Sequence, residues 1–136
     1  MAGYSKRSLA DKLGLKQGMN VVFFHDPSGY RQLLGLRFKD LNVQKNPKGD
    51  MDFIHFFTSS GRELAEQFEI LKKLLKKDGM FWVSWPKKSS RRKTDMTEDV
   101  VRAVALEHGL VDVKVCAVDE IWSGLKLVYR TKDRKK

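Results

Sequence analysis

Short apolar runs alternate along the chain with segments whose apolar residues recur every three or four positions. Three runs, 20–24, 51–57 and 80–85, have the length and continuous apolar character of buried strands. Helices are predicted where a capping residue precedes an amphipathic stripe and a glycine follows it. By this rule, helices begin after Ser8, Ser28, Ser60, and Asp95 or Thr97, and they end at Gly14, Gly35, Asp78-Gly79 and Gly109.

Two segments carry the most definite patterns. Ser60 and Glu63 match the helix start in which each side chain accepts a hydrogen bond from the other residue's backbone N–H. The apolar stripe that follows extends to Leu75 and turns one face of this helix toward the core. Near the C-terminus, alternating valines and polar residues over 111–117 predict a half-exposed strand, with residues 125–129 as an antiparallel partner.

After a short N-terminal helix, the predicted order is strand, helix, short strand (41–43), strand, helix, strand, helix, strand, strand. Parallel strands need crossover helices, and such helices cover both faces of a sheet. The sequence therefore predicts an α/β protein with a three-layer, doubly wound, mostly parallel Rossmann-like sheet and an antiparallel C-terminal strand. We expect one domain over residues 1–129, followed by a basic tail over residues 130–136.

Polar and aromatic residues follow each predicted strand. In doubly wound sheets, ligands bind outside the carboxyl ends of the strands, where helix N-termini also point. The candidate crevice is lined by His25, Asp26, Ser28, Gly29, Thr58, Ser59, Ser60, Trp85 and Trp122. His25 and Asp26 could act as a general base or a phosphate contact. Residues 26–29 also have the composition of an ordinary turn, however, and both tryptophans could be packing residues.

Basic residues exceed acidic ones by ten, and the excess is concentrated in two places. Residues 87–93 contribute five net charges and residues 130–136 contribute four, so the rest of the chain is nearly neutral. Short basic runs bind nucleic acid or other anionic partners, although a solvated loop that only favours solubility has the same composition. The candidate anion-binding residues are Lys87, Lys88, Arg91, Arg92 and Lys93, beside which Trp85 could stack on a base.

The histidines and the cysteine carry weaker patterns. His55 lies within an apolar run and is expected to be a hydrogen-bonded core residue. Cys116 is expected to pack against the sheet, and the spacing of these residues indicates no metal site. Neither a membrane-spanning apolar segment nor a signal-peptide pattern is found, so we expect a soluble, cytoplasmic protein.

Several segments resemble a bacterial family known only as a domain of unknown function. They are residues 2–5 (AGYS), 82–88 (WVSWPKK), 94–102 (TDMTEDVVR), 109–117 (GLVDVKVCA) and 122–125 (WSGL). This resemblance spans nearly the whole chain. It implies a compact S-adenosylmethionine-dependent methyltransferase-like fold, which the order of strands and helices also resembles, and it brings no activity with it.

The methyltransferase pattern is interrupted where its cofactor would bind. Enzymes of this fold place several glycines after the first strand and an acidic residue after the second. Here the first turn is His25-Asp26-Pro27-Ser28-Gly29, in which Pro27 lacks a backbone donor, and residues 44–46 (QKN) contain no acid. We therefore expect no cofactor and retain S-adenosylmethionine as an alternative.

Three functions fit these observations. The first is a non-enzymatic methyltransferase-like module that binds an anionic ligand or nucleic acid at the carboxyl edge of the sheet. The second is an S-adenosylmethionine-dependent methyltransferase with an atypical cofactor loop, and the third is a protein–protein adaptor. The residues leave open whether the protein is an enzyme, and they indicate no oligomeric state.

Overall fold

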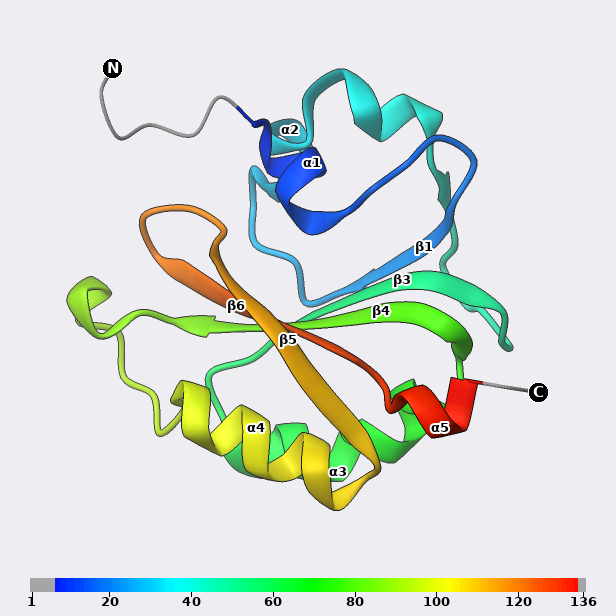
Figure 1. Cartoon of the computed structure of the whole chain (residues 1–136). Helices are drawn as coiled ribbons and strands as arrows, with labels where there is room; N and C mark the ends of the chain where they lie inside the picture. The colour runs from blue at the N-terminus through cyan, green and yellow to red at the C-terminus, as the bar shows by residue number, and fades with distance from the viewer. Residues whose placement is uncertain (1–6, 135–136) are drawn as a thin grey trace.

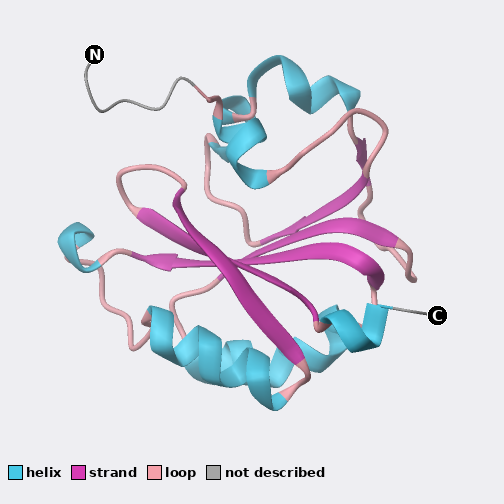
Figure 2. Ribbon diagram, viewed as in Figure 1, coloured by secondary structure: helices cyan, strands magenta, loops and turns pink. Residues whose placement is uncertain are grey.

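A computed structural model describes residues 7–134 as a central sheet between two helical layers (Figure 1, Figure 2). The strands are β1 (Asn20–Phe24), β2 (Asn42–Val43), β3 (Met51–Phe57), β4 (Leu75–Pro86), β5 (Leu110–Ala117) and β6 (Trp122–Tyr129). The α-helices are α1 (Leu9–Leu13), α2 (Tyr30–Leu33), α3 (Gly61–Lys72), α4 (Glu98–Glu107) and α5 (Thr131–Arg134), and 3-10 turns cover Gly35–Asp40 and Lys88–Ser90. None of these helices is long and apolar enough to cross a bilayer. Residues 2–5 of the family resemblance and the last two residues of the basic tail lie outside the described residues.

The strands are arranged in the order β2-β1-β3-β4-β6-β5. β1, β2, β3 and β4 run parallel, whereas β6 is antiparallel to both β4 and β5. From β1 the chain moves outward to β2 and then returns to β3 on the other side of β1. A topological switch point therefore lies between β1 and β3. This topology confirms the predicted doubly wound, mostly parallel sheet with an antiparallel C-terminal strand.

Helices cover both faces of the sheet, with α1 and α2 on one side and α3 and α4 on the other (Figure 1). Phe53 and Trp82 belong to the core on the α1–α2 side, whereas Ile54 and Phe81 belong to the core on the α3–α4 side. Burial on both faces explains why these strands are continuous apolar runs in the sequence. Residues 44–50, between β2 and β3, form no helix, so part of β1 has no helical cover on the α3–α4 side.

Most predicted helix boundaries are confirmed by local hydrogen bonds. The side chains of Ser8, Ser60 and Thr97 each accept a hydrogen bond from the backbone N–H three residues later, at 3.1–3.2 Å. Each cap satisfies a donor that has no partner inside its helix. Gly14 and Gly109, both with φ of 85°, follow α1 and α4 and adopt the left-handed conformation that favours glycine.

The predicted end of α3 is wrong. The helix ends at Lys72, and β4 already begins at Leu75, which pairs with Met51 in the parallel ladder. Asp78-Gly79 therefore lies inside β4, where a Cβ atom on Gly79 would come within 2.9 Å of the Met51 carbonyl oxygen. The apolar residues keep a helical spacing as far as Leu75, but pairing with β3 places Leu75 in a strand.

The predicted start of α2 is wrong, whereas its predicted end at Gly35 is confirmed. Gly29, with φ of 89°, occupies its N-cap position, and no side chain caps the helix, so Ser28 does not have the capping role. At the other end, the α-helix stops at Leu33 with Leu34 as its C-cap. Gly35, with φ of 62°, follows in the left-handed conformation, and a 3-10 turn (Gly35–Asp40) begins there. Both glycines thus supply a left-handed backbone conformation, Gly29 before the helix and Gly35 after it.

The pairing of β5 with β6 is confirmed, but the valines of β5 do not form a buried face. Val113 and Val115 are 52% and 50% exposed, and the buried residues of this strand are Leu110 and Cys116. β5 is an edge strand, and its register with β6 shifts between Asp112 and Lys114. Such an irregularity interrupts the alternation of faces along a strand.

Candidate functional site

Four loops lie along the carboxyl edge of the sheet, as the parallel order of β1, β3 and β4 requires. Thr58 N donates to the Ser84 carbonyl oxygen at 3.0 Å, which holds the end of β3 beside β4. Pro86 pairs with Trp122, which brings the start of β6 to the same edge. Residues 25–29, 58–60, 84–88 and 122–124 are thus neighbours along one edge, as the sequence predicted.

Glu63, in the first turn of α3, links the ends of β1 and β3. Its carboxylate accepts a hydrogen bond from the Thr58 hydroxyl, and Oε2 lies 3.8 Å from Nδ1 of His25. Thr58 Oγ1 accepts a hydrogen bond from Ser60 N at 3.1 Å. The predicted return bond from Glu63 to Ser60 is therefore replaced by a relay through Thr58. His25 has φ of 59°, a conformation that costs energy in a residue with a side chain and is concentrated at functional sites.

The basic loop after β4 is tethered at both ends. Lys87 N donates to the Ile121 carbonyl oxygen at 2.6 Å, which joins the loop to the β5–β6 turn. At the other end, Thr94 Oγ1 donates to the Ser59 carbonyl oxygen at 2.7 Å, which joins the loop to the β3–α3 turn. The loop between these contacts carries all five predicted anion-binding residues.

Asp95 strengthens the second tether. Its Oδ1 accepts a hydrogen bond from Gly61 N, the first residue of α3, at 2.8 Å. Of the two predicted caps for α4, Thr97 is therefore the actual one, and Asp95 caps α3 instead. A carboxylate at this position also interacts favourably with the positive end of α3.

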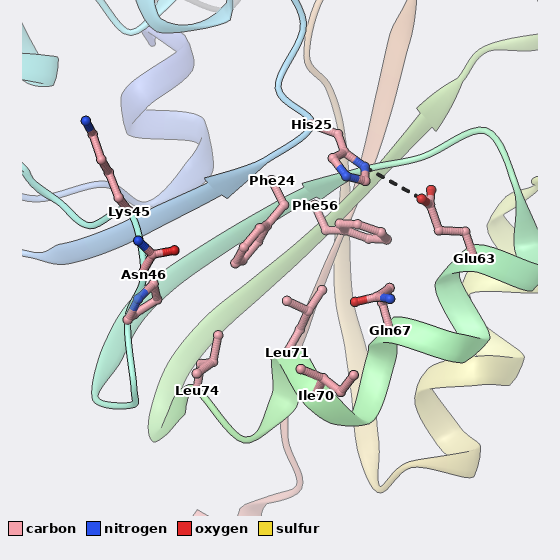
Figure 3. A pocket seen from close by; sticks show the side chains of 11 residues that line it. Phe24, His25, Lys45, Asn46, Phe56, Glu63, Gln67, Ile70, Leu71 and Leu74 are labelled. Carbon is pink, nitrogen blue, oxygen red and sulfur yellow. Dashed lines mark ion pairs between the residues drawn. The ribbon is translucent and has the colours of Figure 1, made fainter.

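A pocket of about 410 Å³ opens at the switch point between β1 and β3 (Figure 3). One wall is apolar, because it contains the part of β1 that no helix covers and the facing side of α3. His25 and Glu63 lie at its upper edge, where Figure 3 shows them pointing toward one another. The lining residues are Phe24, His25, Lys45, Asn46, Pro47, Phe56, Glu63, Gln67, Ile70, Leu71 and Leu74.

A second pocket, of about 440 Å³, lies at the carboxyl end of β4. Lys87, Lys88 and Arg92 line it together with residues at the start of α4. Across residues 7–134, no ion pair involves any of the five cations of the 87–93 loop. Glu98, the one carboxylate that lines this pocket, pairs with Arg102. The pocket therefore carries a net positive charge.

The first turn contributes less to these pockets than the sequence predicted. Asp26 pairs with Arg31 at 3.0 Å. Ser28 and Gly29 are exposed, and neither lines the two pockets at this edge. His25 is the residue of this turn that lies in a pocket.

The two tryptophans do not form one stacking platform. Trp85 pairs with Ser123 and Trp122 with Pro86, so the tryptophans occupy positions of opposite orientation in the β4–β6 ladder. Trp85 is buried in the core on the α3–α4 side and lines the second pocket, whereas Trp122 is buried on the α1–α2 side. Trp85 alone lies next to the basic loop.

His55 is a hydrogen-bonded core residue, as predicted. Its Nδ1 lies 2.7 Å from the Tyr30 hydroxyl, and its Nε2 lies 2.7 Å from the Ser84 hydroxyl. Burial lowers the pKa of His55 to about 3, so the ring is neutral at pH 7. Burial also raises the pKa of the Cys116 thiol, which lowers its reactivity. Residues 7–134 contain no cluster of three or more side chains suited to a metal ion.

Sequence reasoning does not place Glu63, Lys45 or Asn46 in the candidate site. Glu63 has an evident local role as a capping residue, which hides its position between two strand ends. One sequence pattern could reveal this position of Glu63. The pattern is an acidic residue in the first turn of the helix that follows a central strand. Lys45 and Asn46 are brought to the switch point because they follow β2, at the position where methyltransferases were expected to carry an acid.

No protein-family model matches the chain, and no curated protein matches its sequence. Solved structures do resemble it. A SAM-dependent methyltransferase from Aquifex aeolicus has a TM-score of 0.59 at 17% identity, over 88% of this chain and 86% of that one. Magnesium protoporphyrin IX methyltransferase from Synechocystis PCC 6803, with bound SAH, has a TM-score of 0.60 at 11% identity, over 90% of this chain and 78% of that one. A tRNA methyltransferase from B. subtilis has a TM-score of 0.56 at 11% identity, over 98% of this chain and 69% of that one.

The chain therefore has the Rossmann-like α/β fold of SAM-dependent methyltransferases. At these identities the likeness concerns the fold. The local residues depart from the cofactor pattern of that class, because Pro27 offers no donor and residues 44–46, directly after β2, contain no carboxylate. Gly29 has φ of 89°, and a Cβ atom there would meet no protein atom within 4 Å, so the glycine of this turn serves the backbone conformation and not a close contact between protein atoms. The resemblance to a bacterial family of unknown function stays a prediction.

Proposed function

We propose that the protein is a binding module that holds an anionic, phosphate-bearing ligand or a nucleic acid in the pocket at the carboxyl end of β4. The observation that carries the proposal is the group of cations in that pocket. Lys87, Lys88 and Arg92 line it without a partner carboxylate among the described residues, since Glu98 is engaged by Arg102. An anion there gains Coulomb energy and displaces no ion pair of the protein.

The tethers of the loop favour binding. Its contacts at Ile121, Ser59 and Gly61 fix both ends of the loop backbone before a ligand arrives. A preorganised loop loses less conformational entropy when it binds. The pocket also adjoins the N-terminal end of α4 at Thr97, where backbone N–H groups favour negative charge.

Charge reversal tests this proposal. We expect K87E/K88E/R91E/R92E to weaken binding of pyrophosphate and of a labelled oligonucleotide by about tenfold or more and to reduce the dependence of affinity on salt. Titration calorimetry and fluorescence anisotropy measure the two ligands. The matched control is K16E/K39E/K48E/K73E, which changes the net charge equally at exposed positions outside the pocket. Equal losses in both variants would refute the proposal, because net charge alone would then explain binding.

The second candidate is that S-adenosylmethionine binds the switch-point pocket, as the cofactor of a methyltransferase with an atypical first turn. The location of this pocket favours it, since ligands of doubly wound sheets bind at the switch point. The likeness in fold to a methyltransferase solved with bound SAH supports a ligand of this kind. Calorimetry with S-adenosylmethionine and S-adenosylhomocysteine decides the matter, and the absence of heat at millimolar ligand would exclude ordinary use of this cofactor.

A further inference from the structure

Two lysines face each other across the last two strands of the sheet. Lys114 of β5 pairs directly with Lys126 of β6, and both lie on the face that also carries Trp82. Like charges in directly opposite positions destabilise an antiparallel pair. No ion pair within residues 7–134 involves either lysine. Burial, together with the charges of Lys114 and Arg134, lowers the pKa of Lys126. The free protein thus carries an uncompensated repulsion at this place.

Further cations extend the pair in both directions. A groove of about 320 Å³ on one side is lined by Arg7 and Lys12 as well as Lys114. A groove of about 290 Å³ on the other side is lined by Lys126 and Arg134, with Asp78 as the one carboxylate among the described lining residues of either groove. Arg134 is fixed in this position because its Nε donates to the Tyr129 carbonyl oxygen at 2.8 Å. The result is a continuous line of positive charge along the β5–β6 ribbon.

We propose that this cationic stripe, formed by Arg7, Lys12, Lys114, Lys126 and Arg134, binds the phosphate backbone of a nucleic-acid strand. Phosphates placed along the stripe would relieve the repulsion between Lys114 and Lys126. The described lining residues of both grooves include no aromatic side chain on which a base could stack. Contacts are therefore with the backbone, and affinity should depend little on base sequence. This surface is separate from the pocket at the end of β4, so the inference does not rest on that proposed function.

An anionic membrane is the main competing partner, and the stripe fits it less well. Proteins that lie on membranes bury aromatic or long aliphatic side chains at the level of the headgroups. The apolar side chains in the two grooves are mostly short, namely Val113, Val115, Ala117, Val128 and Met80. These residues offer little surface for insertion, whereas the line of cations matches the linear charge of a polynucleotide.

The test compares K114E/K126E with the unchanged full-length protein. Binding of labelled single-stranded oligonucleotides of two unrelated sequences is measured by fluorescence anisotropy at several salt concentrations. We expect affinity to fall by about tenfold or more. The slope of log affinity against log salt should fall by about 1.4, since each lost phosphate contact on a single strand contributes about 0.7. The control K39E/K48E changes the net charge equally at exposed positions outside the grooves and should leave affinity within about twofold.

Three outcomes would overturn the inference. They are unchanged oligonucleotide binding by K114E/K126E, an equal loss in K39E/K48E, or binding to phosphatidylserine vesicles without binding to oligonucleotides. Loss of oligonucleotide binding in K87E/K88E alone would assign it to the β4 pocket and so refute the stripe while leaving the proposed function intact. If the double reversal does not fold, K126M replaces it. K126M should raise the melting temperature at low salt and still weaken binding, and failure of both effects would also refute the stripe.

Discussion

His55 joins α2, β3 and β4 at the centre of the sheet through its two ring nitrogens. Both partners, Tyr30 and Ser84, carry hydroxyl groups that can donate or accept, so a neutral ring is fully satisfied. A protonated ring would be a buried charge without a carboxylate within hydrogen-bonding distance among the described residues. The folded state therefore requires His55 to stay neutral.

This requirement predicts acid sensitivity. The pKa of His55 falls from 6.5 to about 3 on folding, so the unfolded state binds more protons between these values. Stability contributed by the neutral ring is complete above pH 6.5 and is lost as the pH falls toward 3. The loss approaches about 5 kcal/mol, at about 1.4 kcal/mol per pH unit. Thermal unfolding between pH 3 and pH 7 measures it, and a flat profile in the unchanged protein would contradict the assignment.

Two variants separate titration from packing. H55Q should be less stable at pH 7 by about 1–3 kcal/mol, because it leaves a buried hydroxyl without its partner, yet it should depend less on pH. S84A also loses a hydrogen bond but keeps the buried imidazole. The stability of S84A should therefore keep its steep dependence on pH. If stability changed with pH equally in H55Q and S84A, other titrating groups would be responsible.

At the scale of elements, α3 has two caps that differ in their reach. Ser60 is local to the helix, whereas Asp95 arrives from the end of the basic loop, 34 residues along the chain from Gly61. Removing either acceptor leaves a backbone donor at the helix start without its partner. Only Asp95, however, also holds the loop that carries the candidate anion site.

We expect D95A to lower the free energy of unfolding by about 0.5–2 kcal/mol, the usual cost of losing a cap. D95N keeps an acceptor and should recover most of this loss. S60A should cost a similar amount but leave the loop in place. Hydrogen exchange of residues 87–93 distinguishes the variants, since D95A alone should speed it. Equal exchange in D95A and S60A would show that Asp95 does not tether the loop.

The same contrast between local and distant contacts explains what could be predicted from the sequence. The caps at Ser60 and Thr97 depend on partners three residues away, and the runs of β1 and β3 are apolar whichever face they present. The end of α3 instead depends on the pairing of Leu75 with Met51. No local spacing contains that information, so the helical pattern alone predicts too long a helix.

The candidate site also has one part that the sequence predicts and one part that depends on distant contacts. Its edge follows from the parallel order of the strands, which the alternation of runs and helices indicates. The relation between Trp85 and Trp122 depends on the register of β4 against β6, in which a shift of one residue exchanges the two faces. The sequence does not specify this register, and for that reason the sequence pattern alone places the two buried tryptophans in one crevice.

At the scale of the whole molecule, positive charge is distributed over several separate surfaces. The 87–93 loop lies at the carboxyl edge, whereas the cationic stripe runs along the outer ribbon of the sheet. Three carboxylates, those of Glu98, Asp99 and Asp112, are instead paired with the single cation Arg102. The cations of the loop and the stripe therefore repel one another in the free protein, and salt should screen this repulsion.

We predict that the melting temperature rises with sodium chloride from about 0.02 to 0.3 M, because screening reduces the repulsion of a net charge of +10. A gain of about 1 kcal/mol corresponds to roughly 3–5 °C for a chain of this size. In K87E/K88E each substitution lowers the net charge by two, so the net charge falls to +6 and the rise should be smaller. Sulfate at equal ionic strength separates screening from binding. An additional rise in the unchanged protein, absent from K87E/K88E, indicates an anion in the β4 pocket, whereas an equal sulfate effect in both proteins indicates a general solvent effect.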